Sequence, residues 1–343
     1  MPSNSTKILL LTTLVSGVLV SVSSNSWLGA WMGLEINLMS FIPLMSNVKN
    51  MYNTEASLKY FIVQALASAT LLFMVVMKTL TEDLFALEGT AYTPMIICTP
   101  LLLKSGAAPL HWWFPGVMEG LSWENCALLM TVQKAAPLML LSYLIEINTF
   151  TLSIILTSTI VGAIGGLNQT SMRKILTYSS INHTGWMLIA LTLSENLWMV
   201  YFLIYSTLAL TVVSAIKLSG VSFINQTMMT NSEATLMKFM MFTSLLSLGG
   251  LPPFLGFLPK WIIIQAMITN SLVPLATIVV VTSLITLYYY LKISYSSFMI
   301  LNTEPKWNLS SHKTKKSSST KALLLSSISM AGMAACTIIA NIN

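Results

Sequence analysis

Charged residues are scarce in this sequence. Only 8% of its 343 residues are charged, 55% are hydrophobic, and the mean hydropathy is +0.76. Average soluble domains carry about 25% charged residues. The composition therefore excludes a soluble globular protein and predicts an all-α polytopic membrane protein.

The sequence also lacks the motifs by which soluble enzymes bind nucleotides, redox cofactors or metals. The 17 basic residues are all lysines except Arg173, and the three cysteines, Cys98, Cys126 and Cys336, lack metal-ligand spacing. There is no Gly-x-Gly-x-x-Gly, phosphate loop or Cys-x-x-Cys. We expect no cofactor, redox centre or metal in this chain. The net charge of +6 is spread over loops, so we expect no nucleic-acid binding.

Apolar runs long enough to cross a bilayer fill most of the chain. A spanning helix needs about 20 apolar residues. Eleven runs fit, at 8–22, 26–47, 56–79, 91–119, 123–145, 150–166, 172–193, 197–218, 234–269, 272–300 and 322–342. The first follows Lys7 as the core of a signal peptide does, but no small-x-small cleavage site closes it, so we interpret it as a span.

If successive spans cross the membrane in opposite directions, the loops on one side carry mostly basic residues and the loops on the other side mostly acidic ones. The side of the N-terminus receives Lys7, Lys49, Lys59, Arg173, Lys174, Lys217, Lys238, Lys306, Lys313, Lys315, Lys316 and Lys321. The other side receives Lys78 and the acids Glu82, Asp83, Glu88, Glu146 and Glu195. The positive-inside rule then puts the N-terminus in the cytoplasm or matrix and the C-terminus on the opposite side.

Two spans are interrupted in the same way. The pattern Gly-x2-Pro-x5-Pro falls on Gly106, Pro109 and Pro115 in the first and on Gly250, Pro253 and Pro259 in the second. A break at membrane depth is tolerated where it is buried in protein or lines a wet cavity. Matching breaks in two halves are typical of transporters with inverted repeats. Coincidence between two loops rich in small residues is the alternative.

Four ionisable residues lie near mid-depth, where a span should be apolar: Glu35, Lys104, Lys134 and Lys260. A lysine at the centre of a membrane helix costs about 2.5 to 3.5 kcal/mol on insertion scales. For any one of them alone, a structural ion pair or a snorkelling lysine is as good an explanation as a functional role. Desolvation favours the neutral forms of both lysine and glutamate, so four such groups together predict proton handling.

His111 and His183 are the candidate neutral relays. Imidazole both donates and accepts a hydrogen bond near neutral pH. A lone buried histidine is more often a satisfied core residue, and that interpretation stays open for both. The pairs Ile36-Asn37 and Ile181-Asn182 have nearly the same offset as the two breaks, which aligns Glu35 with Ser180.

Three motifs carry a resemblance to a known family: SNSWLGAWMGLEIN at 24–37, TEASLKY at 54–60 and YSSINHTGW at 178–186. Over essentially its whole length the chain resembles the subunit 2 family of mitochondrial NADH:ubiquinone oxidoreductase (complex I), in an arthropod-like form. The resemblance implies an antiporter-like fold of inverted five-helix repeats with two discontinuous helices. The expected divisions are 1–148, 149–301, and 302–343 for a polar matrix loop and a final span.

The resemblance also implies a mechanism. The family's glutamate and three lysines fall on Glu35, Lys104, Lys134 and Lys260. Charge changes elsewhere in the complex open or close the Glu35/Lys104 pair, and Lys104 passes a proton towards Lys134 and Lys260. The chain then acts within a proton-translocating NADH:ubiquinone reductase whose FMN and iron–sulfur clusters lie in other subunits.

The expected partners are other membrane-arm subunits, accessory subunits and phospholipids such as cardiolipin, in the mitochondrial inner membrane. Two alternatives remain at this point. One is a structural scaffold without its own proton channel, and the other is a related cation/proton antiporter. Whether the chain pumps a proton itself or only relays charge is left open.

Overall fold

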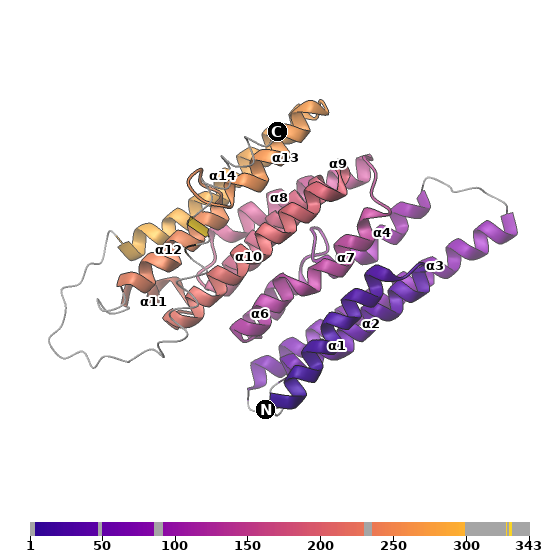
Figure 1. The fold of residues 1–343 in the computed structure, drawn as a ribbon, viewed down its shortest axis with the longest axis horizontal. Coiled ribbons are helices and arrows are strands. Elements are labelled where there is room, and N and C mark those ends of the chain that lie inside the picture. The colour runs from indigo at the N-terminus through magenta and orange to yellow at the C-terminus, as the bar shows by residue number, and fades with distance from the viewer. Residues whose placement is uncertain are drawn as a thin grey trace. The chain divides into compact units, whose positions relative to one another are not determined.

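The computed structural model describes residues 4–46, 50–85, 92–229, 235–298, 327 and 329–330. Most of these residues are helical (Figure 1), and an isolated bridge joins Ser171 to Phe223. The predicted polar loop and last span, 302–343, lie almost wholly outside this part of the chain. The chain separates into two compact units, Met1–Ser158 and Thr159–Asn343.

The first unit is built from seven described helices and the start of an eighth. They are α1 (Asn4–Ser23), α2 (Trp27–Met45), α3 (Met51–Phe85), α4 (Tyr92–Ser105), α5 (Trp113–Gly120), α6 (Trp123–Met130), α7 (Val132–Ser142) and α8 (Thr149–Leu167). The predicted span 91–119 is the interrupted pair α4 and α5. Helix α3 packs on both halves of that pair, and α7 packs on α4.

The second unit contains the rest of α8 and six further described helices. They are α9 (Met172–Leu193), α10 (Glu195–Ser219), α11 (Ile224–Met229), α12 (Thr235–Gly249), α13 (Phe257–Thr269) and α14 (Val273–Phe298). The predicted span 234–269 is the interrupted pair α12 and α13. Helix α10 packs on both halves, and α14 packs on α12.

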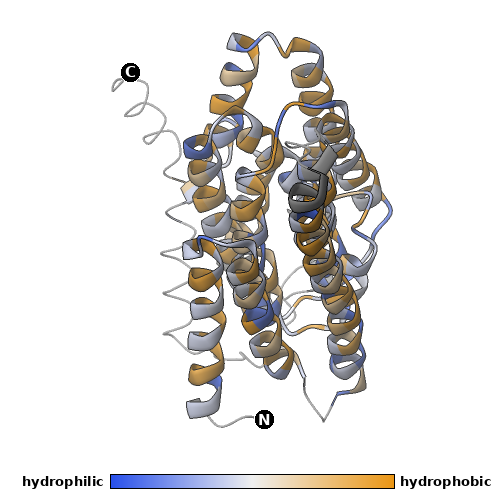
Figure 2. Cartoon of the chain, turned by 90° about the vertical axis from the view of Figure 1, so that its right-hand side faces the viewer, coloured by the Kyte–Doolittle hydropathy of each residue, from blue (hydrophilic) through white to orange (hydrophobic). Residues whose placement is uncertain are grey.

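Six of the described helices are long and apolar enough to cross a membrane, namely α1, α2, α3, α8, α10 and α14. The half-helices at 94–105, 239–249 and 257–269 are shorter but also apolar. Hydrophobic residues extend along the length of the helices (Figure 2), and on α1 the side chains of Ile8, Leu9 and Leu19 are 60% or more exposed. Because such apolar side chains suit lipid rather than water, the chain is a multi-pass membrane protein.

The predicted span 123–145 differs from the structure, which divides it into α6 and α7 at Thr131. The Thr131 backbone N–H and hydroxyl both donate to the carbonyl of Ala127, at 3.1 and 2.7 Å. Pro137 has no N–H and its ring crowds the carbonyl one turn earlier, at Gln133. Thr131 itself has φ −111° and ψ −79°, away from the usual helical values, so the helix is interrupted there.

Glycines allow a matching close helix crossing in each of the two units. A Cβ on Gly17 of α1 would lie 2.8 Å from the Asn37 backbone nitrogen of α2, and one on Gly162 of α8 would lie 2.5 Å from the Asn182 nitrogen of α9. The offset from Gly17 to Gly162 equals that from Asn37 to Asn182. These matching contacts support an internal repeat that begins with α1 and again with α8.

Candidate functional site

The first helix break is a glycine-terminated helix end beside Lys104. Helix α4 ends at Ser105, and Gly106 follows with φ +74°, a left-handed conformation that favours glycine. The Ala107 N–H then donates to the Leu102 carbonyl at 3.1 Å, which closes the helix end. Lys104 lies in this last turn, 7% exposed, where a cation interacts favourably with the helix dipole.

Lys104 lines a small cavity inside the first unit. Its lining residues are Leu34, Asn37, Leu38, Tyr60, Gln64, Lys104, Gln133 and Pro137. The volume open to the centre of a water molecule is about 10 Å³, which is about the size of one water site. Gln133 Nε2 donates to Asn37 Oδ1 at 2.8 Å, and the Tyr60 hydroxyl donates to Gln133 Oε1 at 3.2 Å. A polar wall therefore faces the lysine.

Glu35 lies half-buried on α2, two residues before Asn37. Its carboxylate interacts electrostatically with Lys104. In the described part of the chain the two side chains do not form an ion pair of 4 Å or less. The structure thus places Glu35 and Lys104 in the same unit, without a direct ion pair between their side chains.

Lys134 follows Gln133 on α7 but faces a different neighbour. Its side chain is 2% exposed, and Nζ lies 4.9 Å from the centroid of the Phe114 ring on α5. The same ring packs near Gly106, since a Cβ there would lie 3.6 Å from it. A cation over an aromatic face gains about 2 kcal/mol when desolvated. Phe114 thus connects Lys134 to the first break.

The second break repeats the first in its backbone and adds a lysine contact. Helix α12 ends at Gly249, and Gly250 has φ +81°. Lys260 of α13 is 7% exposed, and its Nζ donates to the Gly249 carbonyl at 2.9 Å. At the first break the Trp113 indole plays the equivalent part, with Nε1 donating to the Leu103 carbonyl at 3.1 Å. The predicted lysine is therefore bonded directly to the broken helix end.

His183 of α9 lies in an aromatic cluster of the second unit. Its Nδ1 and the Tyr201 hydroxyl of α10 are 2.8 Å apart, in a hydrogen bond whose direction depends on the histidine tautomer. The Tyr205 ring lies 4.9 Å away, centroid to centroid. His111 lies in the break between α4 and α5, half-buried, and its Nδ1 has no hydrogen-bond partner in the described part of the chain.

The structure groups the six predicted residues by unit. Glu35, Lys104, His111 and Lys134 belong to the first unit, and His183 and Lys260 to the second. The sequence did not lead us to Tyr60, Gln64, Phe114, Gln133 or Tyr201 as neighbours of these groups. The signal for Gln64 and Gln133 was an amide within an apolar run, which is an uncommon residue at membrane depth. Among the described residues, no group of three or more His, Cys, Asp or Glu side chains is placed to hold a metal ion.

Buried lysines at two interrupted apolar helices, in two similarly built units, define an antiporter-like membrane subunit. Residues 24–286 match the family described as NADH:quinone oxidoreductase/Mrp antiporter. NADH-ubiquinone oxidoreductase chain 2 of Anopheles gambiae is 50% identical over 321 residues, 93% of this chain and 94% of the relative. That of Locusta migratoria is 47% identical over 316 residues, 92% of each. The chain belongs to the NADH-ubiquinone oxidoreductase chain 2 family, and the expected arthropod likeness is confirmed.

Solved structures of two complexes share the fold. A chain of respiratory complex I from Thermus thermophilus has a TM-score of 0.81 at 23% identity, with 97% of this chain and 79% of that chain covered. A chain of the Mrp complex from Dietzia has a TM-score of 0.79 at 18% identity, with 96% and 75% covered. These likenesses confirm the expected antiporter-like, all-α membrane fold.

Proposed function

We propose that this chain is a membrane-arm subunit of respiratory complex I that takes part in proton translocation coupled to electron transfer from NADH to ubiquinone. The observation that carries the proposal is the placement of a buried lysine at each broken helix. Lys104 lines a polar cavity, and Lys260 is bonded to the end of α12. Buried charges are costly in a membrane, which is why they mark ion and proton pathways. The name of the insect relatives supports the same assignment.

The proposed path uses the lysines in order. Lys104 releases a proton towards Lys134, and Lys260 is the further station in the second unit. Glu35 sets the charge that Lys104 experiences, because the two groups interact electrostatically without forming a close ion pair. A lysine in a nonpolar setting releases its proton more readily than one in water.

The two histidines take the proposed role of neutral relays. His183 shares a short hydrogen bond with Tyr201. The tyrosine hydroxyl can donate to Nδ1 when that nitrogen is unprotonated and accept from it when it is protonated, so the bond is kept in both states of the ring. His111 lies in the loop of the first break, between α4 and α5.

The proposed setting is the mitochondrial inner membrane, with the N-terminus in the matrix and the C-terminus in the intermembrane space. The proposed partners are neighbouring membrane-arm subunits, accessory subunits and phospholipids such as cardiolipin. The repeat boundaries follow the sequence, at 1–148 and 149–301, with 302–343 as a matrix loop and final span. The described helices α1 to α7 and α8 to α14 fall on either side of the first boundary. The redox cofactors belong to other subunits.

Cation/proton antiport is a second candidate, favoured by one observation. The fold also matches a chain of the Mrp complex, and the matched family includes Mrp antiporters. Sodium-dependent proton movement by the chain in vesicles would favour this candidate. Proton pumping that depends on NADH and is indifferent to sodium would favour the complex I assignment.

The test of the proposed function is Lys134→Met in the assembled complex, with pumping and NADH:quinone turnover measured together. Methionine has a similar length but no titrating group. We expect normal assembly and a fall in coupled turnover of about a hundredfold, the lower range for a direct proton-transfer group. Unchanged pumping at normal assembly would make the lysine structural and favour the scaffold.

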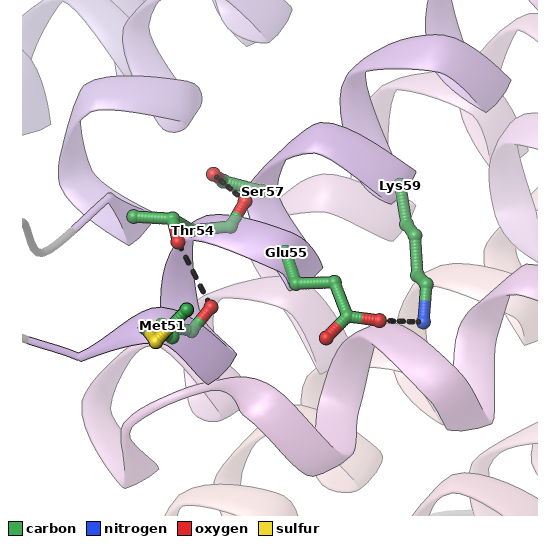
Figure 3. A network of polar contacts seen from close by, with 5 residues as sticks. All are labelled: Met51, Thr54, Glu55, Ser57 and Lys59. Carbon is green, nitrogen blue, oxygen red and sulfur yellow. Dashed lines mark hydrogen bonds and ion pairs between the residues drawn. The ribbon is translucent and has the colours of Figure 1, made fainter.

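The matched control is Lys59→Met, on the same unit. Lys59 forms an exposed ion pair with Glu55 one helical turn earlier, at 2.6 Å (Figure 3). Exposed pairs of this kind contribute about 0 to 1 kcal/mol. The control removes a lysine charge without touching the buried path, so its pumping should match that of the unmodified complex.

A further inference from the structure

The cavity at Lys104 has a wall of polar side chains from three other helices. Asn37 comes from α2, Tyr60 and Gln64 from α3, and Gln133 from α7. Asn37, Tyr60 and Gln64 are 5% exposed or less. Buried amides and phenols are usually satisfied by hydrogen bonds. Here two bonds join three of them into a chain, from Tyr60 to Gln133 to Asn37.

This chain fixes the orientation of the Gln133 amide. Its Nε2 donates to Asn37 Oδ1 and its Oε1 accepts from Tyr60, so neither end rotates without breaking a bond. The Tyr60 ring is itself held edge-on by Phe41 and Trp113, at centroid distances of 5.3 and 5.8 Å. One N–H and one lone pair of the amide remain for the cavity.

The chemistry of this wall suits a lysine that must change its charge. An ammonium group needs acceptors, and a neutral amine needs a donor for its lone pair. An amide offers both, within a space of about one water molecule. Gln133 also precedes Lys134 directly, just after the helix interruption at Thr131.

We infer that Gln133, clamped by Asn37 and Tyr60, is a positioning residue that binds one water molecule against Lys104, and that this water receives the proton. In this step an N–H bond of the Lys104 ammonium breaks, an O–H bond forms on the water, and the positive charge passes to the water. The water then loses another of its protons towards Lys134, which lies outside the cavity lining, and becomes neutral again. The inference rests on the proposed function and adds residues that bind no proton themselves.

A purely structural role is the competing explanation, because the same two bonds tie α2, α3 and α7 together. Neutral hydrogen bonds contribute about 0.5 to 1.5 kcal/mol each. A structural loss lowers the amount of assembled complex but leaves the pH profile of each assembled complex unchanged. A loss of positioning changes that profile, since the balance between charged and neutral Lys104 depends on the amide.

The experiment compares Gln133→Met with Asn125→Leu in the assembled complex. Asn125 Nδ2 donates to the Leu44 carbonyl at 2.9 Å, so the control also removes one inter-helix amide bond, away from the cavity. We expect Gln133→Met to lower coupled turnover per assembled complex by roughly tenfold, less than loss of a direct proton-transfer group. We also expect it to shift the pH profile, while Asn125→Leu leaves the profile in place.

Tyr60→Phe covers the case in which Gln133→Met does not assemble. It keeps the ring packing and removes only the hydroxyl that holds Gln133 Oε1, so we expect the same shift in the pH profile with a smaller loss of turnover. An unchanged profile in the assembling variant, Gln133→Met or Tyr60→Phe, would overturn the inference. An unchanged profile combined with a loss of pumping in Lys134→Met would remove the role of Gln133 and leave the proposed function standing.

Discussion

Lys260 Nζ donates a hydrogen bond of 2.9 Å to the carbonyl of Gly249, across eleven residues and a helix break. The last carbonyls of a helix have no partner within the helix, and a cation there interacts favourably with the helix dipole. Lys260 is therefore both a candidate proton carrier and the group that completes the end of α12. Charge on this lysine and the geometry of the break are coupled.

The coupling at Lys260 predicts a specific effect of Gly250→Ala. Gly250 has φ +81°, and a Cβ there would lie 3.1 Å from Lys260 Nζ. The left-handed conformation costs about 1 to 2 kcal/mol with a side chain, and the methyl group also displaces the lysine. We expect reduced thermal stability of the assembled complex together with reduced proton pumping.

Gly220→Ala is the control for that prediction. Gly220 ends α10 with φ +67°, but nothing lies within 4 Å of a Cβ there. Alanine at position 220 would therefore have a similar backbone strain to alanine at position 250, but its methyl group would contact no lysine. Equal losses of pumping in both variants would show that strain alone explains the effect.

A second prediction concerns His183 and Tyr201. Tyr201→Phe removes the hydroxyl 2.8 Å from Nδ1 and leaves the ring in place. If the histidine relays a proton, its protonated Nδ1 then loses this acceptor, and coupled turnover per assembled complex falls about tenfold or more. Proton pumping and turnover, each divided by the amount of assembled complex, check this. A loss of assembly with unchanged turnover per assembled complex would assign the bond a structural role.

A third prediction concerns the helix crossings. Gly17→Ala and Gly162→Ala should both reduce assembly, because the added carbon would lie 2.8 and 2.5 Å from backbone nitrogens of the next helix. Overpacking of this kind costs about 1 to 3 kcal/mol. Gly116→Ala is the neutral comparison, since its Cβ would meet nothing within 4 Å. Quantifying assembled complex on native gels distinguishes the three, and normal assembly of both crossing variants would contradict the packing account.

Much of the fold was predictable from the sequence, for local reasons. Long apolar runs require helices, and the Gly/Pro pattern placed both breaks where α4 and α12 end. The offset between Asn37 and Asn182 was also visible, but the glycine crossings at these residues were not predicted. The boundary at Thr131 was missed, because no glycine or proline marks it and the proline of this span, Pro137, comes six residues later.

The surroundings of the candidate site were harder to predict. Gln133 meets Asn37 and Tyr60 across 96 and 73 residues, and no local pattern specifies such pairs. The buried charges themselves were visible, because a lysine in an apolar run is uncommon whatever its partners. The sequence thus identified the buried ionisable groups, and only the fold shows which residues surround them.

The most direct test of the central claim, that buried lysines carry protons, is proton pumping by assembled complex bearing Lys104→Arg. Arginine keeps the positive charge but does not release a proton at any working pH. We expect assembly to be retained and coupled pumping to fall as far as in Lys104→Met. Pumping near the unmodified level in Lys104→Arg, with loss only in Lys104→Met, would show that a fixed charge suffices and would contradict proton transfer through this lysine.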